Sequence, residues 1–504
     1  MFREDRVLSA ATLVLAISVL WPLFVTPFLP LVDLGSTVGA ANLLDDAAFG
    51  HGVIAKHYAI HLQLVPYWTI YLLLALLEHL VGPVIAVKCV VGLCVLLVPI
   101  AAMRLLVALG RNPRLGLWVF ILSWDTNLYW GWITFQIGMA CGLFVLARLI
   151  EMETWREARN TLFLTVIIAL THVHAVVLVM VAGGLLAFLR RPFWSSFWKH
   201  ALALSGAVVV LVPWLWDKIL GTHARAAGHY TFDMRSLEEK LRQLFAYTID
   251  NLPAHVNITA AGFALLLAAA AGMSLLPTRE VELRRRLASL VIVVALAGLY
   301  FGLPFAIWGP IYHWFTYPRY GTYLLIALLT LPRPALERWP AALALVPGVI
   351  AAVLIHQAVA EQFAEYGRYT APYRGIIAAL PRNKAFFPLD LDDYRFRGTR
   401  EAVLGQLHGY AAAVKSCYDP HLFDEPNNPL LFRHETMLPV PNWRNQREFD
   451  MAQQGQYYDY VIVHPLDRDP FAGGRARHAG LKLIKQSGAW RLYKVLAPHP
   501  YPPR

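Results

Sequence analysis

Two aspartates lie where a carboxylate could carry out proton chemistry at a membrane surface. Asp33 follows directly on the first long apolar run, residues 7–31, and Asp125 lies in the segment 124–127. A charged side chain at the centre of a bilayer costs roughly 2.5–3.5 kcal/mol, so an acid at the end of an apolar run usually has a function. We therefore expect Asp33 to act as a catalytic base, with Asp125 as a second catalytic candidate.

Four basic side chains accompany these acids: Arg319, His172, His174 and His313. Together with the two acids, these side chains at similar depth predict a polar cavity at the outer ends of the spans. His172 and His174 could bind a divalent metal such as Mg²⁺ or Mn²⁺ together with Asp125, and Asp33 is another possible metal ligand. His172 and His174 are two residues apart and would not share a helix face, so a joint role requires a helix break between them.

Each candidate also has a structural interpretation. Asp33 could cap a helix, Asp125 could stabilise a turn, and the histidines could hydrogen-bond within a helix bundle. Arg319 could be an anchor in the aromatic belt at the membrane interface, where the aromatic side chains of segment 308–320 would also lie. At the level of sequence, both interpretations stay open.

The composition identifies the class of protein that must position these residues. Of the 504 residues, 57% are hydrophobic and only 15% are charged, and the mean hydropathy is +0.47. These values exclude an ordinary soluble protein and indicate a multi-spanning membrane protein. The net charge of +11 is accompanied by arginine clusters at the ends of apolar runs. Membrane topology explains that pattern, so we expect membrane lipids and no nucleic acid as partners.

The arginine clusters also predict the direction of each crossing. Arg3 and Arg6 place the N-terminus in the cytoplasm, and about eleven crossings then keep the short arginine-rich loops on that side. The predicted spans are 8–29, 84–108, 115–130, 135–150, two short spans that meet near 171–174 within 161–190, 201–216, 258–276, 287–306, 320–332 and 339–356. This topology places Asp33 on the extracytoplasmic face of the cell membrane, either a plasma or an inner membrane.

Two regions outside the spans are expected on the same outer face. Residues 31–83 would form an outer loop, in which the amphipathic stretch 65–80 lies on the membrane surface as an interfacial helix. Long apolar runs end near residue 357, which predicts a transmembrane catalytic domain over 1–356 and a small extracytoplasmic α/β domain over 357–504. The expected elements of that domain are strands at 460–463, 481–484 and 490–493 and a helix at 401–417.

In this layout the chain resembles the GT-C superfamily of membrane glycosyltransferases, which use sugars linked to polyprenyl phosphate. The resemblance rests on the acid after the first span (Asp33), the long outer loop, the second acid near the next outer turn (Asp125), the broken pair of spans at 171–174, the aromatic turn that ends in 318–320, and the soluble C-terminal domain. The paired-acid motif of the family is missing from the start of the first loop, and Asp45-Asp46 lies further along.

The resemblance implies a GT-C-like α-helical bundle and an inverting transfer of a sugar from a polyprenyl-phosphate-linked donor to a lipid, glycan or protein acceptor. Asp33 would be the general base, while Arg319 and the three histidines would bind the donor phosphate. A polytopic transporter or flippase also needs polar residues inside a bundle, but such proteins commonly contain inverted repeats, and we find none in the sequence. A glycan ligase that uses a lipid-linked donor has the same expected layout, and a non-catalytic assembly partner is a further alternative.

Overall fold

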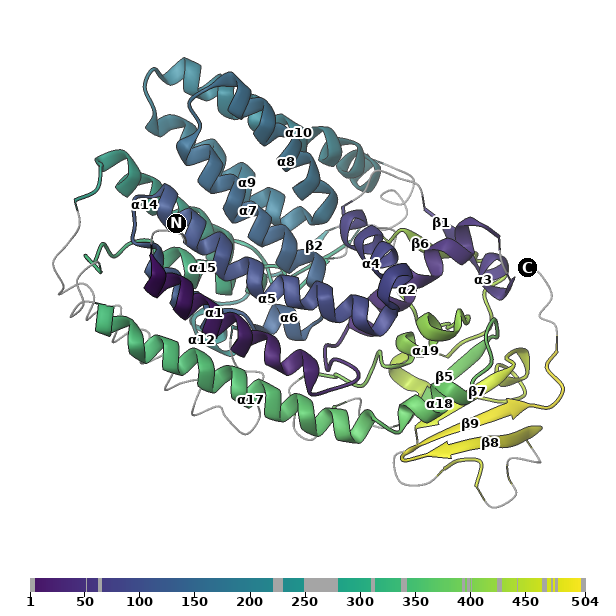
Figure 1. The fold of residues 1–504 in the computed structure, drawn as a ribbon. Helices are drawn as coiled ribbons and strands as arrows, with labels where there is room; N and C mark the ends of the chain where they lie inside the picture. The colour runs from purple at the N-terminus through teal and green to yellow at the C-terminus, as the bar shows by residue number, and fades with distance from the viewer. Residues whose placement is uncertain are drawn as a thin grey trace.

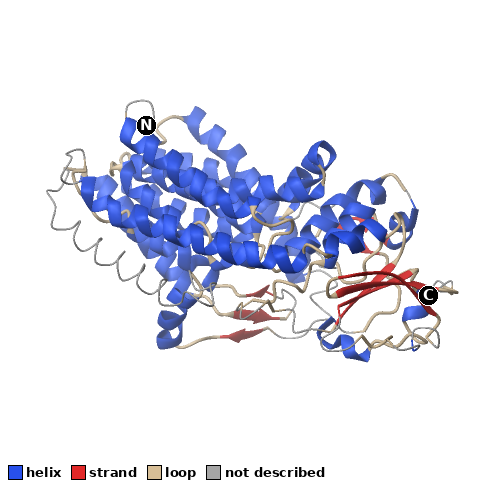
Figure 2. Cartoon of the chain, turned by 60° about the horizontal axis from the view of Figure 1, so that its bottom comes forward, coloured by secondary structure: helices blue, strands red, loops and turns tan. Residues whose placement is uncertain are grey.

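The structure is a computed structural model, and it describes residues 5–499 apart from 51, 62–65, 221–229, 249–279, 310–312, 337–341, 392–394, 397–398, 400, 424–427, 442, 465–468, 473–474 and 476–478. The described part is mostly helical. A bundle of long helices makes up most of the molecule, and a four-stranded sheet lies at the end that carries the C-terminus (Figures 1 and 2).

Six helices of the described residues are long and apolar enough to cross a membrane, which confirms a multi-pass membrane protein. They are Arg6–Phe24 (α1 and η1), Pro83–Ala108 (α5), Ile133–Glu151 (α7), Phe193–Trp216 (within α10, Phe193–Leu220), Leu283–Gly302 (α14) and Leu343–Thr370 (η5 and α17). The predicted span 258–276 lies outside the described residues. The total of about eleven spans therefore stays a prediction.

Two predicted spans are wrong as single membrane-crossing helices. In place of 115–130 the chain forms the 3₁₀ helix η2 (Pro113–Leu122), a turn, and the short helix α6 (Thr126–Tyr129), which Asp125 caps. Ten residues of 3₁₀ helix rise only about 20 Å, less than the ~30 Å hydrocarbon core. In place of 320–332 lie η4 (Pro318–Tyr320) and α15 (Gly321–Leu328), and the eight residues of α15 rise only about 12 Å.

The predicted helix break at the histidines is confirmed. Helix α8 (Trp155–Thr171) ends at His172, and α9 (Val173–Leu186, continued by η3, Ala187–Leu189) begins directly after it. His172 itself is extended, with φ −164° and ψ 131°. α8 packs along α10, α5 along α7 and α7 along α9, so the break lies inside the bundle at the end where α7 begins.

The predicted domain boundary at 356/357 falls inside α17 (Val346–Thr370), which continues without interruption. Polar residues enter the sequence there, but Val359, Phe363 and Tyr366 remain buried. This spacing is typical of an amphipathic helix with one apolar face. The fall in hydropathy therefore marks the place where one face of the helix meets water, and the helix runs on toward the C-terminal sheet (Figure 1).

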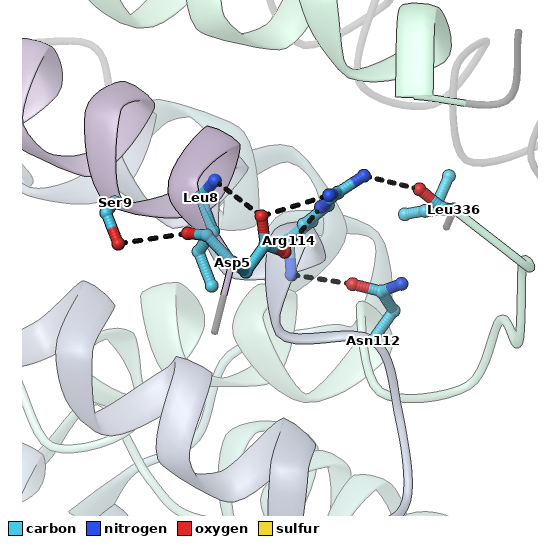
Figure 3. Close-up of polar contacts among 6 residues, drawn as sticks. All are labelled: Asp5, Leu8, Ser9, Asn112, Arg114 and Leu336. Carbon is cyan, nitrogen blue, oxygen red and sulfur yellow. Dashed lines mark hydrogen bonds and ion pairs between the residues drawn. The ribbon is translucent and has the colours of Figure 1, made fainter. Parts of the chain in front are cut away.

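One end of the bundle is tied together by arginines, and we call it the arginine end. Arg114 donates from Nε to Asp5 Oδ2 at 2.7 Å, from Nη2 to Asp5 Oδ1 at 3.0 Å, and from Nη1 to the Leu336 carbonyl at 2.6 Å (Figure 3). These contacts join the start of α1 to the start of η2. Arg104 pairs with Glu151, which joins the last turns of α5 and α7 at the same end.

The outer-loop region consists of α2 (Leu34–Ala48), α3 (Gly52–His57), β1 (Tyr58–Ile60) and α4 (Trp68–Val81). The helix predicted at 65–80 is thus present as α4. β1 pairs antiparallel with β6 (Leu430–Phe432) of the C-terminal region, with Tyr58 opposite Phe432. α2 also packs against α19 (His408–Lys415). The outer loop and the C-terminal region are therefore packed against each other.

The C-terminal sheet has the strand order β5-β7-β9-β8, in which β5 and β7 are parallel and the other pairs are antiparallel. Its strands are β5 (Phe386–Asp390), β7 (Tyr460–His464), β8 (Leu481–Ser487) and β9 (Trp490–Val495). The three predicted strands are present, and α19 forms part of the helix predicted at 401–417. Helix α18 (Tyr373–Ala379) contacts β8 and β9. A separate three-stranded sheet contains β2 (Thr231–Asp233), β3 (Ala306–Trp308) and β4 (His313–Trp314).

Remaining short elements complete the described chain: α12 (Leu237–Ala246), η6 (Trp443–Glu448) and η7 (Gly455–Tyr457).

Candidate functional site

Asp33 lies at the start of α2, where backbone hydrogen bonds hold it against the turn before α7. Its backbone N–H donates to the Trp130 carbonyl at 3.0 Å, and the N–H of Val32 donates to the Tyr129 carbonyl at 2.9 Å. Gly131, at φ +80°, packs so closely that a Cβ atom there would lie 2.7 Å from the Leu34 nitrogen. A left-handed backbone and this close approach both require glycine. The turn therefore fixes the position of the Asp33 backbone from which the carboxylate side chain extends.

Trp132 connects Asp33 to Arg319. The indole Nε1–H donates to Asp33 Oδ2 at 3.0 Å. The guanidinium carbon of Arg319 lies 3.6 Å from the centroid of the Trp132 ring, well within the range of a cation–π contact. The predicted base and the predicted phosphate-binding residue therefore meet at the same tryptophan.

Arg319 is a buried cation held by its own turn. It lies on η4 with 9% of its surface exposed. Its Nε donates to the Phe315 carbonyl at 3.1 Å, and its Nη2 lies 3.4 Å from the Trp314 carbonyl as a second donor. A charge is seldom buried unless its donors have partners. These contacts hold the guanidinium group in place over the Trp132 ring.

The three predicted histidines gather beside this arginine. His172 caps α9 by accepting the backbone N–H of His174 at its Nδ1, and the two rings stack with centroids 5.2 Å apart. His174 Nε2 lies 3.2 Å from Nε2 of His313 on β4. All three imidazoles lie within electrostatic reach of Arg319. The helix break thus brings the two histidine rings together, which is the arrangement that a joint role would need.

Aromatic side chains form the wall around these polar groups. Trp130 stacks on Trp132 with centroids 5.4 Å apart, and Trp314 contacts Trp130 edge-on at 4.9 Å. Phe315 lies 5.3 Å from Trp132 and is buried. Of the predicted aromatic segment 308–320, Trp308 is 46% exposed, whereas Trp314 and Phe315 belong to the site wall.

Asp125 lies apart from this group, in a fully buried position with no exposed surface. Its carboxylate accepts hydrogen bonds from Asn127 Nδ2 at 2.7 Å, from Thr322 Oγ1 at 2.5 Å, from the Leu128 backbone N–H at 3.0 Å, and from Gln136. Both oxygens have donors, so the carboxylate is engaged in holding α6, α7 and α15 together. Asn127 Nδ2 also lies 3.4 Å from the Arg319 carbonyl, which links Asp125 to the turn that carries the arginine.

The described residues contain no group of three or more histidine, cysteine, aspartate or glutamate side chains placed to hold a metal ion. The oxygens of Asp125 are used by protein donors, and Asp33 accepts from Trp132. Neither aspartate therefore belongs to a cluster of this kind within the described part of the chain.

Sequence reasoning missed the residues that join the predicted ones. Trp132 connects Asp33 to Arg319, and Gly131 fixes the turn. Phe135 packs edge-on against His172 at 5.3 Å and against His174 at 6.0 Å. The signal was the run Trp130-Gly131-Trp132 shortly after Asp125, because a glycine between two aromatic residues at a helix start indicates a tight backbone approach.

Comparison with known proteins gives matches at the level of structure. No protein-family model matches the chain, and no curated protein matches its sequence. ArnT from Cupriavidus metallidurans, solved bound to undecaprenyl phosphate, is 11% identical with a TM-score of 0.53, and the match covers 100% of both chains. The arabinofuranosyltransferase AftD from mycobacteria is 18% identical with a TM-score of 0.50, and the match covers 99% of this chain but 40% of AftD.

The chain therefore spans less than half the length of AftD, while it matches ArnT over its full length. At these identities the similarity establishes the fold alone, and this chain shares its fold with ArnT and with part of AftD.

Proposed function

We propose that the protein is a membrane glycosyltransferase that moves a sugar from a polyprenyl-phosphate-linked donor to a hydroxyl group of a lipid, glycan or protein acceptor. The observation that carries this proposal is the double contact of Trp132, whose N–H meets Asp33 and whose ring meets Arg319. It places a proton acceptor at the edge and a phosphate-binding cation over the face of one rigid side chain. The fold shared with ArnT, which was solved with undecaprenyl phosphate, supports the choice of donor.

In the proposed reaction Asp33 is the general base. Its carboxylate takes the proton of the acceptor hydroxyl while that oxygen attacks the anomeric carbon of the donor sugar. The bond from the anomeric carbon to the phosphate oxygen breaks, and its electron pair leaves with the polyprenyl phosphate, so the anomeric configuration inverts. General-base catalysis of this kind contributes about 10²–10⁴-fold to the rate. The Trp132 N–H orients the carboxylate through Oδ2.

Arg319 binds the leaving phosphate in this proposal. The charge that develops on a departing phosphate is stabilised by a cation that is already fixed in place, and Arg319 is fixed by the Trp314 and Phe315 carbonyls and by the Trp132 ring. His174 and His313 extend the polar surface on the same side.

Asp125 has a positioning role in this scheme, because its partners on α6, α7 and α15 support the turn of Arg319. The remaining parts of the proposal are topological. The site opens on the extracytoplasmic face of the cell membrane, the N-terminus is cytoplasmic, and the C-terminal α/β domain lies outside.

The test separates proton transfer from phosphate binding. Purified protein is assayed for binding of undecaprenyl phosphate and for sugar transfer from a panel of undecaprenyl-phosphate sugars to a membrane extract. Asp33→Asn keeps an oxygen for the Trp132 N–H but cannot take a proton, so transfer should fall by about 10²–10⁴-fold while undecaprenyl phosphate still binds. Arg319→Ala should weaken binding about 10–100-fold, the loss expected for hydrogen bonds to a charged group.

Arg242 supplies the matched control, because its side chain is 78% exposed and pairs only with its helix neighbour Glu238 among the contacts of the described residues. Arg242→Ala should leave binding and transfer unchanged. Full transfer by Asp33→Asn would remove Asp33 from the mechanism, and unchanged lipid binding by Arg319→Ala would assign Arg319 to structure alone.

A further inference from the structure

A polar cavity lies at the arginine end of the bundle, far from Asp33. It has a volume of about 350 Å³ and is formed by the α7–α8 turn, the α9–α10 turn and the start of α14. That volume falls in the range of roughly 300–1,000 Å³ typical of small-molecule sites. The nineteen residues of α7 separate it from Trp132, a rise of about 28 Å. This distance approaches the ~30 Å thickness of the hydrocarbon core, so the cavity faces the opposite membrane surface.

The cavity carries an excess of positive charge. Four cations line it, namely Arg190, Arg191, Lys199 and Arg284, against the two carboxylates of Glu153 and Glu282. The Glu153 side chain is exposed, and Arg284 Nε lies 3.5 Å from Glu282 Oε1. Since the cations outnumber the carboxylates two to one, the cavity attracts an anion.

Two of these cations also hold the cavity walls in place. Arg190 Nη2 donates to the Ile150 carbonyl at 2.6 Å, and Lys199 Nζ donates to the Glu153 carbonyl at 2.5 Å. These bonds join the last turn of α7 to the residue after η3, and the α7–α8 turn to α10. Two of the four cations are therefore held on the cavity walls by the backbone of the bundle.

The backbone adds to the positive potential. Ser195 and Ser196 in the first turn of α10 line the cavity. The start of a long helix carries a partial positive charge and N–H groups without helical partners, and it is a common place for a phosphate group to bind. The side-chain cations and the helix start thus point to the same kind of ligand.

Exposed tryptophans place the mouth of the cavity at the membrane surface. Trp194 is 68% exposed and Trp198 is 57% exposed, and both flank the cavity residues of α10. Tryptophan is enriched where lipid headgroups meet the hydrocarbon core. Basic pockets between transmembrane helices at this depth bind the headgroups of anionic lipids.

We propose that this cavity binds the phosphate-bearing headgroup of an anionic membrane phospholipid, on the membrane face opposite to the site around Asp33. The phosphate lies among Arg190, Arg191, Lys199 and Arg284 at the start of α10, and the acyl chains run between Trp194 and Trp198 into the bilayer. The proposal does not depend on catalysis by Asp33.

The experiment measures lipid binding to the purified, delipidated full-length protein in detergent by native mass spectrometry. The probes are phosphatidylglycerol, which is anionic, and phosphatidylcholine, which has no net charge. Phosphatidylglycerol should bind at least tenfold more tightly than phosphatidylcholine. In the Arg191→Gln/Arg284→Gln variant the affinity for phosphatidylglycerol should fall about 25-fold, because each cation removed costs about fivefold.

The matched control is Arg156→Gln/Arg159→Gln. Both arginines are exposed on the first turns of α8 at the same end, but they do not line the cavity. This variant loses the same charge and should bind phosphatidylglycerol within threefold of the unmodified protein. Lys199→Gln provides a second, single-site variant if the double variant unfolds.

Inorganic phosphate at 10 mM distinguishes a lipid from a free anion and should not displace the bound phosphatidylglycerol. Displacement by phosphate alone would overturn the assignment to a lipid. Equal binding of the two lipids, or equal loss in the cavity and control variants, would overturn the site itself.

Discussion

Trp132 makes two contacts that a single substitution can separate. Trp132→Phe removes the Nε1–H that donates to Asp33 at 3.0 Å but keeps an aromatic ring below the Arg319 guanidinium. A hydrogen bond to a charged group contributes about 1.5–3 kcal/mol. If the bond is needed to orient the carboxylate in the transition state, its loss lowers the transfer rate about 10–150-fold.

The effect on donor binding should be much smaller. Phenylalanine has a weaker cation–π interaction than tryptophan, but the whole contact is worth only about 0.5–2 kcal/mol. Replacing one aromatic ring by another removes part of that, so undecaprenyl phosphate should bind within about fivefold of the unmodified protein. Trp132→Ala removes both contacts and should reduce transfer and binding together.

The assay records sugar transfer at saturating donor and undecaprenyl phosphate binding for each variant. Trp130→Phe is the matched control, because Trp130 stacks on Trp132 while its buried Nε1 has no hydrogen-bond partner among the described residues. It should retain transfer within about threefold. Equal transfer rates in Trp130→Phe and Trp132→Phe would refute the argument that the Trp132 N–H orients Asp33.

Two further predictions concern the scaffold. Gly131→Ala should lower the thermal stability and the transfer rate together, because at φ +80° its Cβ would lie 2.7 Å from the Leu34 nitrogen. The control is Gly480→Ala, at φ +67° with open space around it, which measures the cost of backbone strain alone, about 1–3 kcal/mol. Equal losses of stability in the two variants would refute the steric argument. His57 is buried, meets the Thr436 carbonyl at 2.6 Å, and has its pKa lowered to about 4 by burial. Since the unfolded histidine binds its proton near pH 6.5, the packing of α3 on the C-terminal region should weaken as pH falls from about 6.5 toward 4. Hydrogen exchange of α3 across that pH range measures this loss, and His57→Phe should flatten it; an unchanged pH profile in His57→Phe would assign the effect to other groups.

The features that could be predicted from the sequence have local signals. Asp33 stands at the end of an apolar run, and His172 and His174 interrupt another, so both the position of the acid and the helix break follow from neighbouring residues alone. The strands β7, β8 and β9 likewise have short alternating or apolar patterns that are visible without tertiary structure. The predictions of these elements are correct because the local conformational preference of the residues agrees with their packing in the structure.

The features that could not be predicted depend on residues far apart in the chain. The role of Asp125 is set by Thr322, which is 197 positions away, and by Gln136. The sequence around Asp125 is typical of a turn and does not indicate that the side chain is completely buried. The length of α17 was missed for a different reason, because a window of mean hydropathy cannot distinguish the end of a helix from the point where one face of it becomes polar.

The C-terminal domain has a direct influence on the candidate site, although its sequence reads as a separate soluble unit. Gly35, in the first turn of α2, packs so closely on α19 and the segment before it that a Cβ there would lie 1.7 Å from the Gln406 carbonyl oxygen; a Cβ on Gly409 would lie 2.1 Å from the Gly35 oxygen. Ser36 also donates to Gln406 Oε1 at 2.6 Å.

Because Asp33 immediately precedes this turn, the C-terminal domain fixes the backbone on one side of the carboxylate. The Tyr129–Gly131 turn fixes it on the other side, through the hydrogen bonds to Val32 and Asp33. A catalytic carboxylate needs this kind of support, since an error of about 1 Å in its position can reduce the rate about 10²-fold. The C-terminal region therefore forms part of the scaffold around Asp33, and its packing against α2 joins it to the helix bundle at the point where the proposed chemistry takes place.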